Sequence, residues 1–250
     1  EKNAKISLEN MQKNIDKDKE TIKQLAKLLN LIDVPKNIES YDISNTSGTD
    51  IVGGMIVIEI GKFKKNRDRK FKIKDMHDQD DPRSMAQVID RRLNKAINEK
   101  NEAFLPLPDL ILLDGGITQL NAVKEVLSKY TLNIPMYGMV KDDKHRTKAI
   151  LDSNNKTINL DNEIVKNFVT NIQDEIHNYT IEYHRKLRDN KVTKSILDNI
   201  DGIGPKKKQA LLKQFGSIEN IQNASVNDIK SVNGITEDLA IKIKEELNKI

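Results

Sequence analysis

Hydrophobic and polar positions between residues 38 and 73 fall into short runs typical of β-strands. An apolar run at 38–44 carries Asp42 near its end and leads into the turn-rich residues 45–49. A second run, 51–60, follows at once, and a Gly-Lys turn then reverses the chain into a third run at 70–73. Short β-type runs joined by tight turns predict an antiparallel meander.

Helical periodicity marks three longer stretches. Residues 5–32 carry apolar side chains at mostly helical spacing, which predicts one or two helices. Asp81 stands directly before a proline, an arrangement that favours a helix start, and the apolar spacing continues to residue 97. A further long helix is predicted over 161–188, with His177 next to its buried face.

Two strands and a helix are predicted between those last two helices. A continuous apolar run at 109–113, flanked by breakers, is typical of a strand buried on both faces. It ends at Asp114 and turns through two glycines into a helix at 118–127. A second strand is predicted at 136–140 and a small polar hairpin at 144–160. This order predicts an α/β fold with a mixed sheet flanked by helices.

The last part of the chain contains an internal repeat. Ile-Asp-Gly-Ile-Gly at 200–204 returns as Val-Asn-Gly-Ile-Thr at 232–236. Each copy follows a short helix and precedes another, at 205–215 and at 237–247. Two copies of helix, glycine hairpin and helix predict a small, separate all-α domain.

The length of 250 residues suits one large and one small domain. We expect linker helices at 1–35, an α/β domain at 36–190 and a helical domain at 194–250. No apolar run approaches the ~20 residues of a membrane span, so no membrane partner is expected. The absence of cysteine excludes disulfides and cysteine nucleophiles and predicts a cytoplasmic location.

Basic residues gather in separate places although the net charge is only +4. They cluster at 62–74, at 184–188 and at 206–208. Separate basic clusters indicate a polyanionic partner, and a solvated lysine-rich surface is the alternative interpretation.

Two acids at strand ends are the strongest candidates for chemistry. Adjacent strands lie ~4.8 Å apart, so Asp42 and Asp114 can reach one divalent cation. Carboxylate oxygens suit Mg²⁺ or Mn²⁺, which stabilise the attacking and leaving oxygens in phosphodiester cleavage. Asp81 is a further acid, and His177 could bind metal or relay a proton. The alternatives are aspartates that cap turns and a partly buried helix histidine.

The glycine hairpins are candidates for contact with phosphate. In the first, Gly202 and Gly204 permit a positive φ and a close approach of backbone to phosphate, and the lysines at 206–208 add charge. The second hairpin keeps Gly234 but has Thr236 in place of its second glycine, so we expect a weaker grip. A purely structural pair of helical hairpins is the alternative.

Several of these segments together closely resemble the C-terminal half of the UvrC family, the incision subunit of bacterial nucleotide excision repair. The matching segments are Tyr41–Ser44, Asp80–Met85, Leu113–Gly116, Asp174–His177, His184–Lys186 and Gly202–Lys206. The resemblance implies a ribonuclease H-like endonuclease domain followed by a tandem helix-hairpin-helix domain. It also implies incision on the 5′ side of a lesion in double-stranded DNA, with UvrB as partner and UvrA acting upstream.

The resemblance also assigns roles to residues. It implies catalysis by Asp42, Asp81, Asp114 and His177, with Mg²⁺ or Mn²⁺ held by Asp42, Asp114 and His177. The expected DNA contacts are Gly202, Ile203, Gly204, Lys206, Lys207, Lys208, Gly234, Arg185 and Lys186. Two positions depart from the family pattern, because Asn45 replaces a histidine and Gln173 replaces an arginine.

Two other functions remain open at this point. The chain could be a DNA-binding scaffold whose acids no longer cut, or another ribonuclease H-like nuclease such as a junction resolvase. The sudden start of the chain and the lack of the family's other nuclease and of its UvrB-binding module indicate a fragment.

Overall fold

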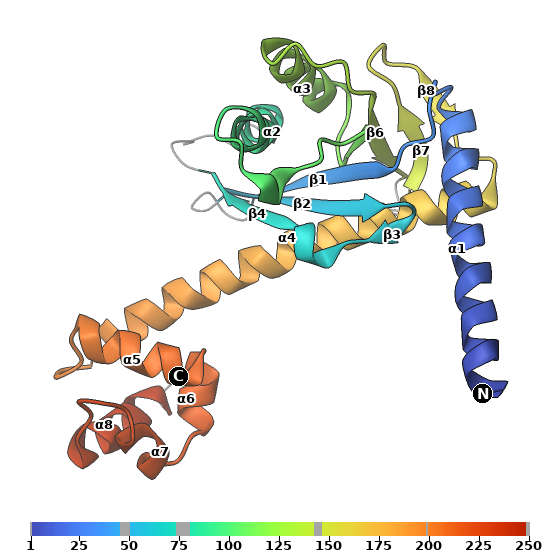
Figure 1. Ribbon diagram of the computed structural model, residues 1–250. Coiled ribbons are helices and arrows are strands. Elements are labelled where there is room, and N and C mark those ends of the chain that lie inside the picture. Colours follow the sequence, from blue (N-terminus) through green and yellow to red (C-terminus); the bar gives the residue numbers. More distant parts are fainter. Residues whose placement is uncertain (1, 46–50, 74–80, 143–146, 199, 249–250) are drawn as a thin grey trace. The chain divides into compact units, whose positions relative to one another are not determined.

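The computed structural model describes residues 2–45, 51–73, 81–142, 147–198 and 200–248, with side chains described from residue 15 onward except at 186–196 and 198. The chain divides into two compact units, Glu1–His184 and Arg185–Ile250, which we call the sheet unit and the hairpin unit (Figure 1). Each is considered by itself. The turn residues 46–50 and the position before Asp81 lie outside the described residues.

One mixed sheet of eight strands forms the centre of the sheet unit. Along its main path the order is β3-β2-β1-β5-β6-β7-β8, and β4 pairs with β2. The bounds are β1 Asn37–Asn45, β2 Ile51–Glu59, β3 Lys62–Phe63, β4 Arg69–Lys72, β5 Leu110–Leu113, β6 Met136–Lys141, β7 Thr147–Leu151 and β8 Thr157–Asn159. Among the described strands, β1 with β5 and β5 with β6 form the parallel pairs, so the carboxyl ends of β1, β5 and β6 lie at one edge.

The predicted meander is confirmed, because β1, β2 and β4 pair antiparallel in turn. The hairpin predicted at 144–160 is confirmed as β7 and β8, but it is part of the main sheet. Its first strand, β7, pairs with β6 and buries Ala149, Ile150 and Leu151, so the hairpin extends the main sheet. The sequence window looked polar because β8, the outer strand, is largely exposed.

Helices cover both faces of the sheet, and strand parity decides which side chain faces which helix. Helices α2 (Asp81–Ile97) and α3 (Ile117–Lys129) pack on one face, against odd-numbered residues such as Tyr41, Met55 and Leu113. The long helix α4 (Glu163–Asp198) and the end of α1 (Lys2–Leu28) pack on the other, against even-numbered residues such as Ile56 and Leu112. Short 3₁₀ turns, η1 (Lys65–Arg67) and η2 (Glu102–Phe104), complete the unit.

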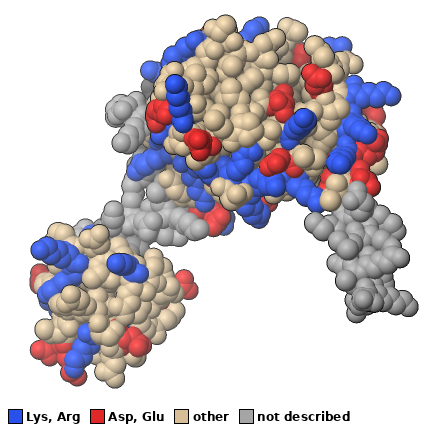
Figure 2. Space-filling view, viewed as in Figure 1, with Lys and Arg blue, Asp and Glu red and all other residues tan. Residues whose placement is uncertain are grey.

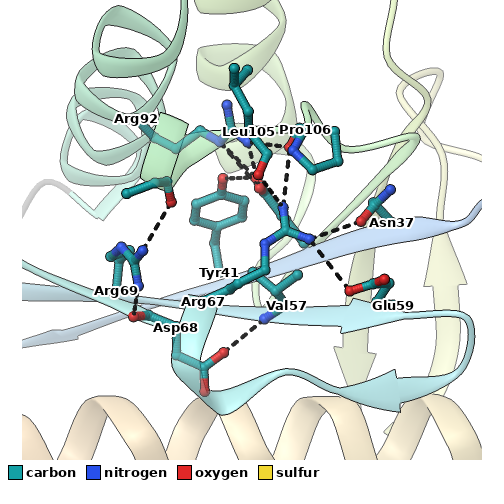
Figure 3. Close-up of polar contacts among 12 residues, drawn as sticks. Asn37, Tyr41, Val57, Glu59, Arg67, Asp68, Arg69, Arg92, Leu105 and Pro106 are labelled. Carbon is teal, nitrogen blue, oxygen red and sulfur yellow. Dashed lines mark hydrogen bonds and ion pairs between the residues drawn. The ribbon is translucent and has the colours of Figure 1, made fainter. Parts of the chain in front are cut away.

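A buried ion pair fastens β1 to α2. The Arg92 guanidinium, 1% exposed, donates from Nε and Nη2 to the Glu39 carboxylate, and the Tyr41 hydroxyl donates to the same group. Arg92 also donates to the Pro106 carbonyl, and Arg67 donates to Asn37 and to the same loop (Figure 3). Because removing one partner of such a pair leaves a buried charge, this network fixes the odd-numbered face of β1.

The hairpin unit is a small helical fold around the sequence repeat. After the end of α4 come α5 (Pro205–Phe215), α6 (Ile218–Asn223), α7 (Val226–Lys230) and α8 (Glu237–Leu247). The predicted helices at 205–215 and 237–247 are confirmed at both ends. Equivalent isoleucines of the two hairpins, Ile203 and Ile235, are both buried in the common core. Among the described residues, none of the helices combines the length and apolar composition that a membrane crossing requires.

Candidate active site

The two predicted acids lie side by side at the carboxyl edge of the parallel strands. Tyr41 of β1 is in register with Leu113 of β5, and the Asp114 N–H donates to the Tyr41 carbonyl at 2.8 Å. The next row of the sheet therefore holds Asp42 beside Asp114. Both are even-numbered, so both point to the face that α4 covers.

Helix α4 brings the predicted histidine to these acids. The His177 Nδ1 atom lies 3.5 Å from Asp42 Oδ2 and 4.0 Å from Asp114 Oδ2. One ligand atom from each of the three residues lies within 4.8 Å of the other two. The structure thus assembles residues that stand far apart in the sequence into one group, which we call the acid–histidine site.

Burial sets the electrostatics of this site. Asp42 is 6% exposed, and burial raises the pKa of its carboxyl, with the nearby Asp114 charge raising it further and the His177 hydrogen bond opposing the rise. The hydrogen bond to Asp42 raises the pKa of His177, whose side chain is 47% exposed. Two buried carboxylates facing each other favour a cation between them, because a positive charge offsets both desolvation and mutual repulsion.

The distances from His177 to the two carboxylates are compatible with one shared divalent cation. Two atoms bound to one Mg²⁺ at about 2.1 Å can lie at most about 4.2 Å apart. The His177 distances of 3.5 and 4.0 Å are inside that limit. Two carboxylates and one imidazole are also a donor set that Mn²⁺ accepts.

Two further residues support Asp114, and both escaped the sequence analysis as site residues. Lys141, at the end of β6, donates to Asp114 Oδ2 at 2.8 Å. Gln173 of α4, 1% exposed, donates from Nε2 to Asp114 Oδ1 at 2.8 Å and to the Met139 carbonyl. The Thr147 hydroxyl donates to Gln173 in turn. The sequence analysis noted Gln173 only as a departure from the family pattern. In the structure its side chain contacts Asp114, so the departure lies directly beside the site.

Asp81 and two acids next to His177 on the chain, Asp174 and Glu175, lie outside this group. Asp81 is exposed at the first residue of α2, and the three-residue cluster does not include it. Asp174 is exposed on α4, and Glu175 pairs with Lys65 at 3.3 Å. The catalytic role of Asp81 stays a prediction.

The two hairpins share one backbone shape. Gly202 and Gly234 have φ of +93° and +85°, a region that favours glycine. Gly204 and Thr236 both cap the following helix in an extended conformation, with φ of −87° and −84°. The Thr236 hydroxyl accepts the Leu239 N–H, so threonine at this position suits the same backbone.

The surroundings of the hairpins differ in charge. The first turn of α5 carries Lys206, exposed, with Lys207 and Lys208 half-buried beside it, whereas the first turn of α8 carries Glu237 and Asp238. Ile203 is buried, and its N–H donates to Ile200 within the turn. Arg185 is exposed near the start of the hairpin unit, and the Lys186 side chain lies outside the described residues. All nine DNA contacts stay predictions.

A basic surface also follows the edge of the sheet unit. Figure 2 shows Lys and Arg side chains gathered over the part of the unit that contains β3, η1 and β4. The residues there are Lys62, Lys64, Lys65, Arg67, Arg69, Lys70 and Lys72. Several of them already contact acids or aromatic rings, including Lys65 with Glu175 and Lys70 with Tyr179.

Comparison with known proteins identifies the class of each unit. The family described as UvrC RNAse H endonuclease domain matches residues 26–181, and the SAM-like helix-hairpin-helix tandem family matches residues 194–249. The fold and the acid–histidine site thus belong to an endonuclease domain of the ribonuclease H class, followed by a tandem helix-hairpin-helix domain.

Curated relatives give the particular family. UvrABC system protein C of Acetivibrio thermocellus is 45% identical over 97% of this chain and 42% of its own length, and that of Clostridium novyi is 42% identical over 99% and 42%. The chain belongs to the UvrC family, as the resemblance predicted, and spans about 42% of the length of these relatives. A crystal structure of human ENDOV matches 62% of this chain and 86% of its own with a TM-score of 0.38 at 8% identity, too low to establish a common fold.

Proposed function

We propose that this chain is a divalent-metal-dependent endonuclease that makes the 5′ incision beside a lesion in double-stranded DNA. The observation that carries the proposal is the convergence of Asp42, Asp114 and His177 in a domain of the UvrC endonuclease family. The donor set and its spacing support Mg²⁺ or Mn²⁺ as the cofactor. Membership of the family supports UvrB as the partner, UvrA as an upstream factor and the cytoplasm as the location.

The residues have distinct roles in this proposal. A bound cation supplies positive charge to the attacking and leaving oxygens of the phosphodiester. Asp42 and Asp114 would hold this cation, and His177, whose ring is half-exposed, would complete the binding site or transfer a proton. Gln173 orients Asp114, as outer partners of metal-binding carboxylates commonly do.

Lys141 adds a positive charge on the β6 side of the site. Its ammonium lies 2.8 Å from Asp114 Oδ2, and its side chain is 26% exposed, so it can face both the carboxylate and a phosphate oxygen. Asp81 is assigned a supporting role for a second ion or for the attacking water, because the family resemblance implies it.

DNA binding is assigned to two regions. The first hairpin offers Gly204 and the N-terminus of α5 with Lys206 to Lys208, and backbone N–H groups with lysines at a helix start bind phosphate without reading sequence. The basic surface along β3, η1 and β4 is the second region. Together they would hold the duplex by its backbone, without reading its sequence.

The test uses Asp42→Ala and Asp114→Ala on a lesion-containing duplex that is already nicked on the 3′ side, with UvrB and Mn²⁺ present. Both variants are expected to lose 5′ incision while they still bind DNA. Asp174→Ala changes an exposed acid on α4, three residues before His177; it is the control and should cut like the unchanged chain. Retained incision in both site variants would end the assignment.

The same assay separates the other two functions. A scaffold without catalysis would bind duplex fully and show no metal-dependent turnover in the unchanged chain. A junction-type nuclease would cut branched DNA faster than bubble or damaged duplex.

A further inference from the structure

Helix α4 crosses the sheet in step with the strands beneath it. Over four residues a helix rises about 6 Å, close to the ~4.8 Å between neighbouring strands. Successive turns of α4 therefore meet successive strands. The meeting pairs are Gln173 with Asp114 after β5, His177 with Asp42 on β1, Thr180 with Gly54 on β2, and Tyr183 with Lys70 on β4.

Gly54 is the member of this row without a side chain. It is in register with Asp42 on one side and with Lys70 on the other. A Cβ atom at Gly54 would lie 2.3 Å from Thr180 Oγ1, more than 1 Å short of the 3.4 Å at which ordinary contact begins. It would also lie 3.1 Å from Ile176 Cδ1. The β2 backbone can therefore lie this close to α4 only because Gly54 has no side chain.

The groups that meet this position have little freedom to move aside. Thr180 is fully buried, and its hydroxyl donates to the Ile176 carbonyl at 2.8 Å within the helix. Ile176 is itself fully buried in the core between α4 and the sheet. An added methyl group would therefore push the turn of α4 that carries His177 away from the sheet.

We propose that Gly54 is a positioning residue of the acid–histidine site, which holds α4 close enough to β1 for His177 to share a cation with Asp42. The inference rests on the proposed metal-dependent function. His177 Nδ1 already lies 4.0 Å from Asp114 Oδ2, near the about 4.2 Å limit for two atoms on one Mg²⁺. A withdrawal of 1 Å takes the imidazole out of that limit.

The neighbouring glycine provides a matched control. A Cβ at Gly53 would lie 2.5 Å from Val88 Cγ2 of α2, a comparable collision on the opposite face of the sheet. Both substitutions strain the packing of a helix on β2, but of the two helices only α4 carries a member of the acid–histidine site, His177. If Gly54 has a purely structural role, both substitutions should change Mn²⁺ affinity equally. If Gly54 positions His177, only its own substitution should lower that affinity.

The experiment measures Mn²⁺ affinity and 5′ incision for Gly54→Ala, Gly53→Ala, Thr180→Ala and the double variant Gly54→Ala/Thr180→Ala, with thermal unfolding of each. Gly54→Ala should weaken Mn²⁺ binding about tenfold or more, the size seen when outer partners of metal ligands are lost. Gly53→Ala and Thr180→Ala should bind Mn²⁺ within about twofold of the unchanged chain. The double variant, which removes the 2.3 Å contact, should recover most of the affinity.

Each outcome either supports or overturns the positioning role of Gly54. Unchanged Mn²⁺ affinity in Gly54→Ala, an equal loss in Gly53→Ala, or no recovery in the double variant would overturn the positioning role. If Gly54→Ala does not fold, Thr180→Leu applies the same pressure from the helix side, and wild-type affinity in that variant overturns the role. If the unchanged chain binds no Mn²⁺ through Asp42, the proposed function itself fails.

Discussion

The acid–histidine site and the glycine hairpins are built on opposite principles. The site gathers Asp42, Asp114 and His177 from two strands and a helix, and its two carboxylates are almost fully buried. The first hairpin is made by neighbours in the chain, and its Lys206 side chain is exposed. Buried acids suit tight binding of a small cation, while exposed lysines suit a long, screened polyanion. The difference implies that cutting and holding DNA can be impaired separately.

A smaller comparison lies inside the hairpin unit. The two hairpins have nearly the same backbone angles, yet one precedes three lysines and the other precedes Glu237 and Asp238. Anions are repelled by acids at a helix start, so we expect the first hairpin to make most of the DNA contact. Charge, rather than the missing second glycine, is the feature that distinguishes them.

The largest effect is expected from Asp42→Asn or Asp114→Asn. Each replacement keeps the side-chain volume and removes a charged ligand, so incision should fall about a hundredfold or more. Binding to duplex DNA should stay within about twofold. Single-turnover incision and a filter-binding titration measure the two quantities. Loss of binding together with cutting would mean that the two functions are not separable.

The next effect concerns the lysines of the first hairpin. With Lys206, Lys207 and Lys208 all changed to Gln, the slope of log K against log salt should become shallower by about 2 to 3, because each phosphate contact contributes about 0.9. Incision at saturating protein should be unchanged. Lys213→Gln, an exposed lysine at the far end of the same helix, is the control. An unaltered slope would mean that another surface makes the phosphate contacts.

A moderate effect is expected from pH on Mn²⁺ affinity. The hydrogen bond to Asp42 raises the pKa of His177, so the imidazolium persists above the ordinary value of 6.5. Mn²⁺ must displace that proton, and its affinity should keep rising with pH beyond 6.5, by up to about tenfold per unit. Calorimetric titration at several pH values measures this. In His177→Gln the rise should largely disappear, and an identical profile there would contradict the account.

The smallest effect tests the contrast between the hairpins. Neutralising the second one with Glu237→Gln and Asp238→Asn should tighten DNA binding about two- to fivefold at low salt, because two repulsive charges leave a helix start. Glu219→Gln with Asp228→Asn, acids in the first turns of α6 and α7, which do not follow a glycine hairpin, would serve as a charge-matched comparison. Equal tightening in both pairs would show that only net charge matters.

Local patterns in the sequence predicted much of this molecule. Turn residues and strand runs located β1, β2, β4 and β5, and the repeated glycine segments located α5 and α8 to the residue. Asp42 and Asp114 were predicted as a pair because both end apolar strands, and the parallel β1–β5 pairing places them in adjacent positions.

The remaining site features depend on contacts that no local pattern encodes. Lys141 reaches Asp114 only because β6 pairs with β5, and Gln173 does so only because α4 crosses at that point. The sequence marks Gly54 only as a glycine within a strand, because its close approach to Thr180 depends on where α4 packs on the sheet. The helix predicted to end at 188 continues to Asp198, since nothing in the sequence between them breaks a helix.

The most direct test of the central claim is a crystal of the chain grown with Mn²⁺, measured at a wavelength where manganese scatters anomalously. The account predicts a peak about 2.1 to 2.3 Å from carboxylate oxygens of Asp42 and Asp114, with a His177 ring nitrogen as the third protein ligand. A manganese peak bound elsewhere, with these three side chains still paired to one another, would contradict it.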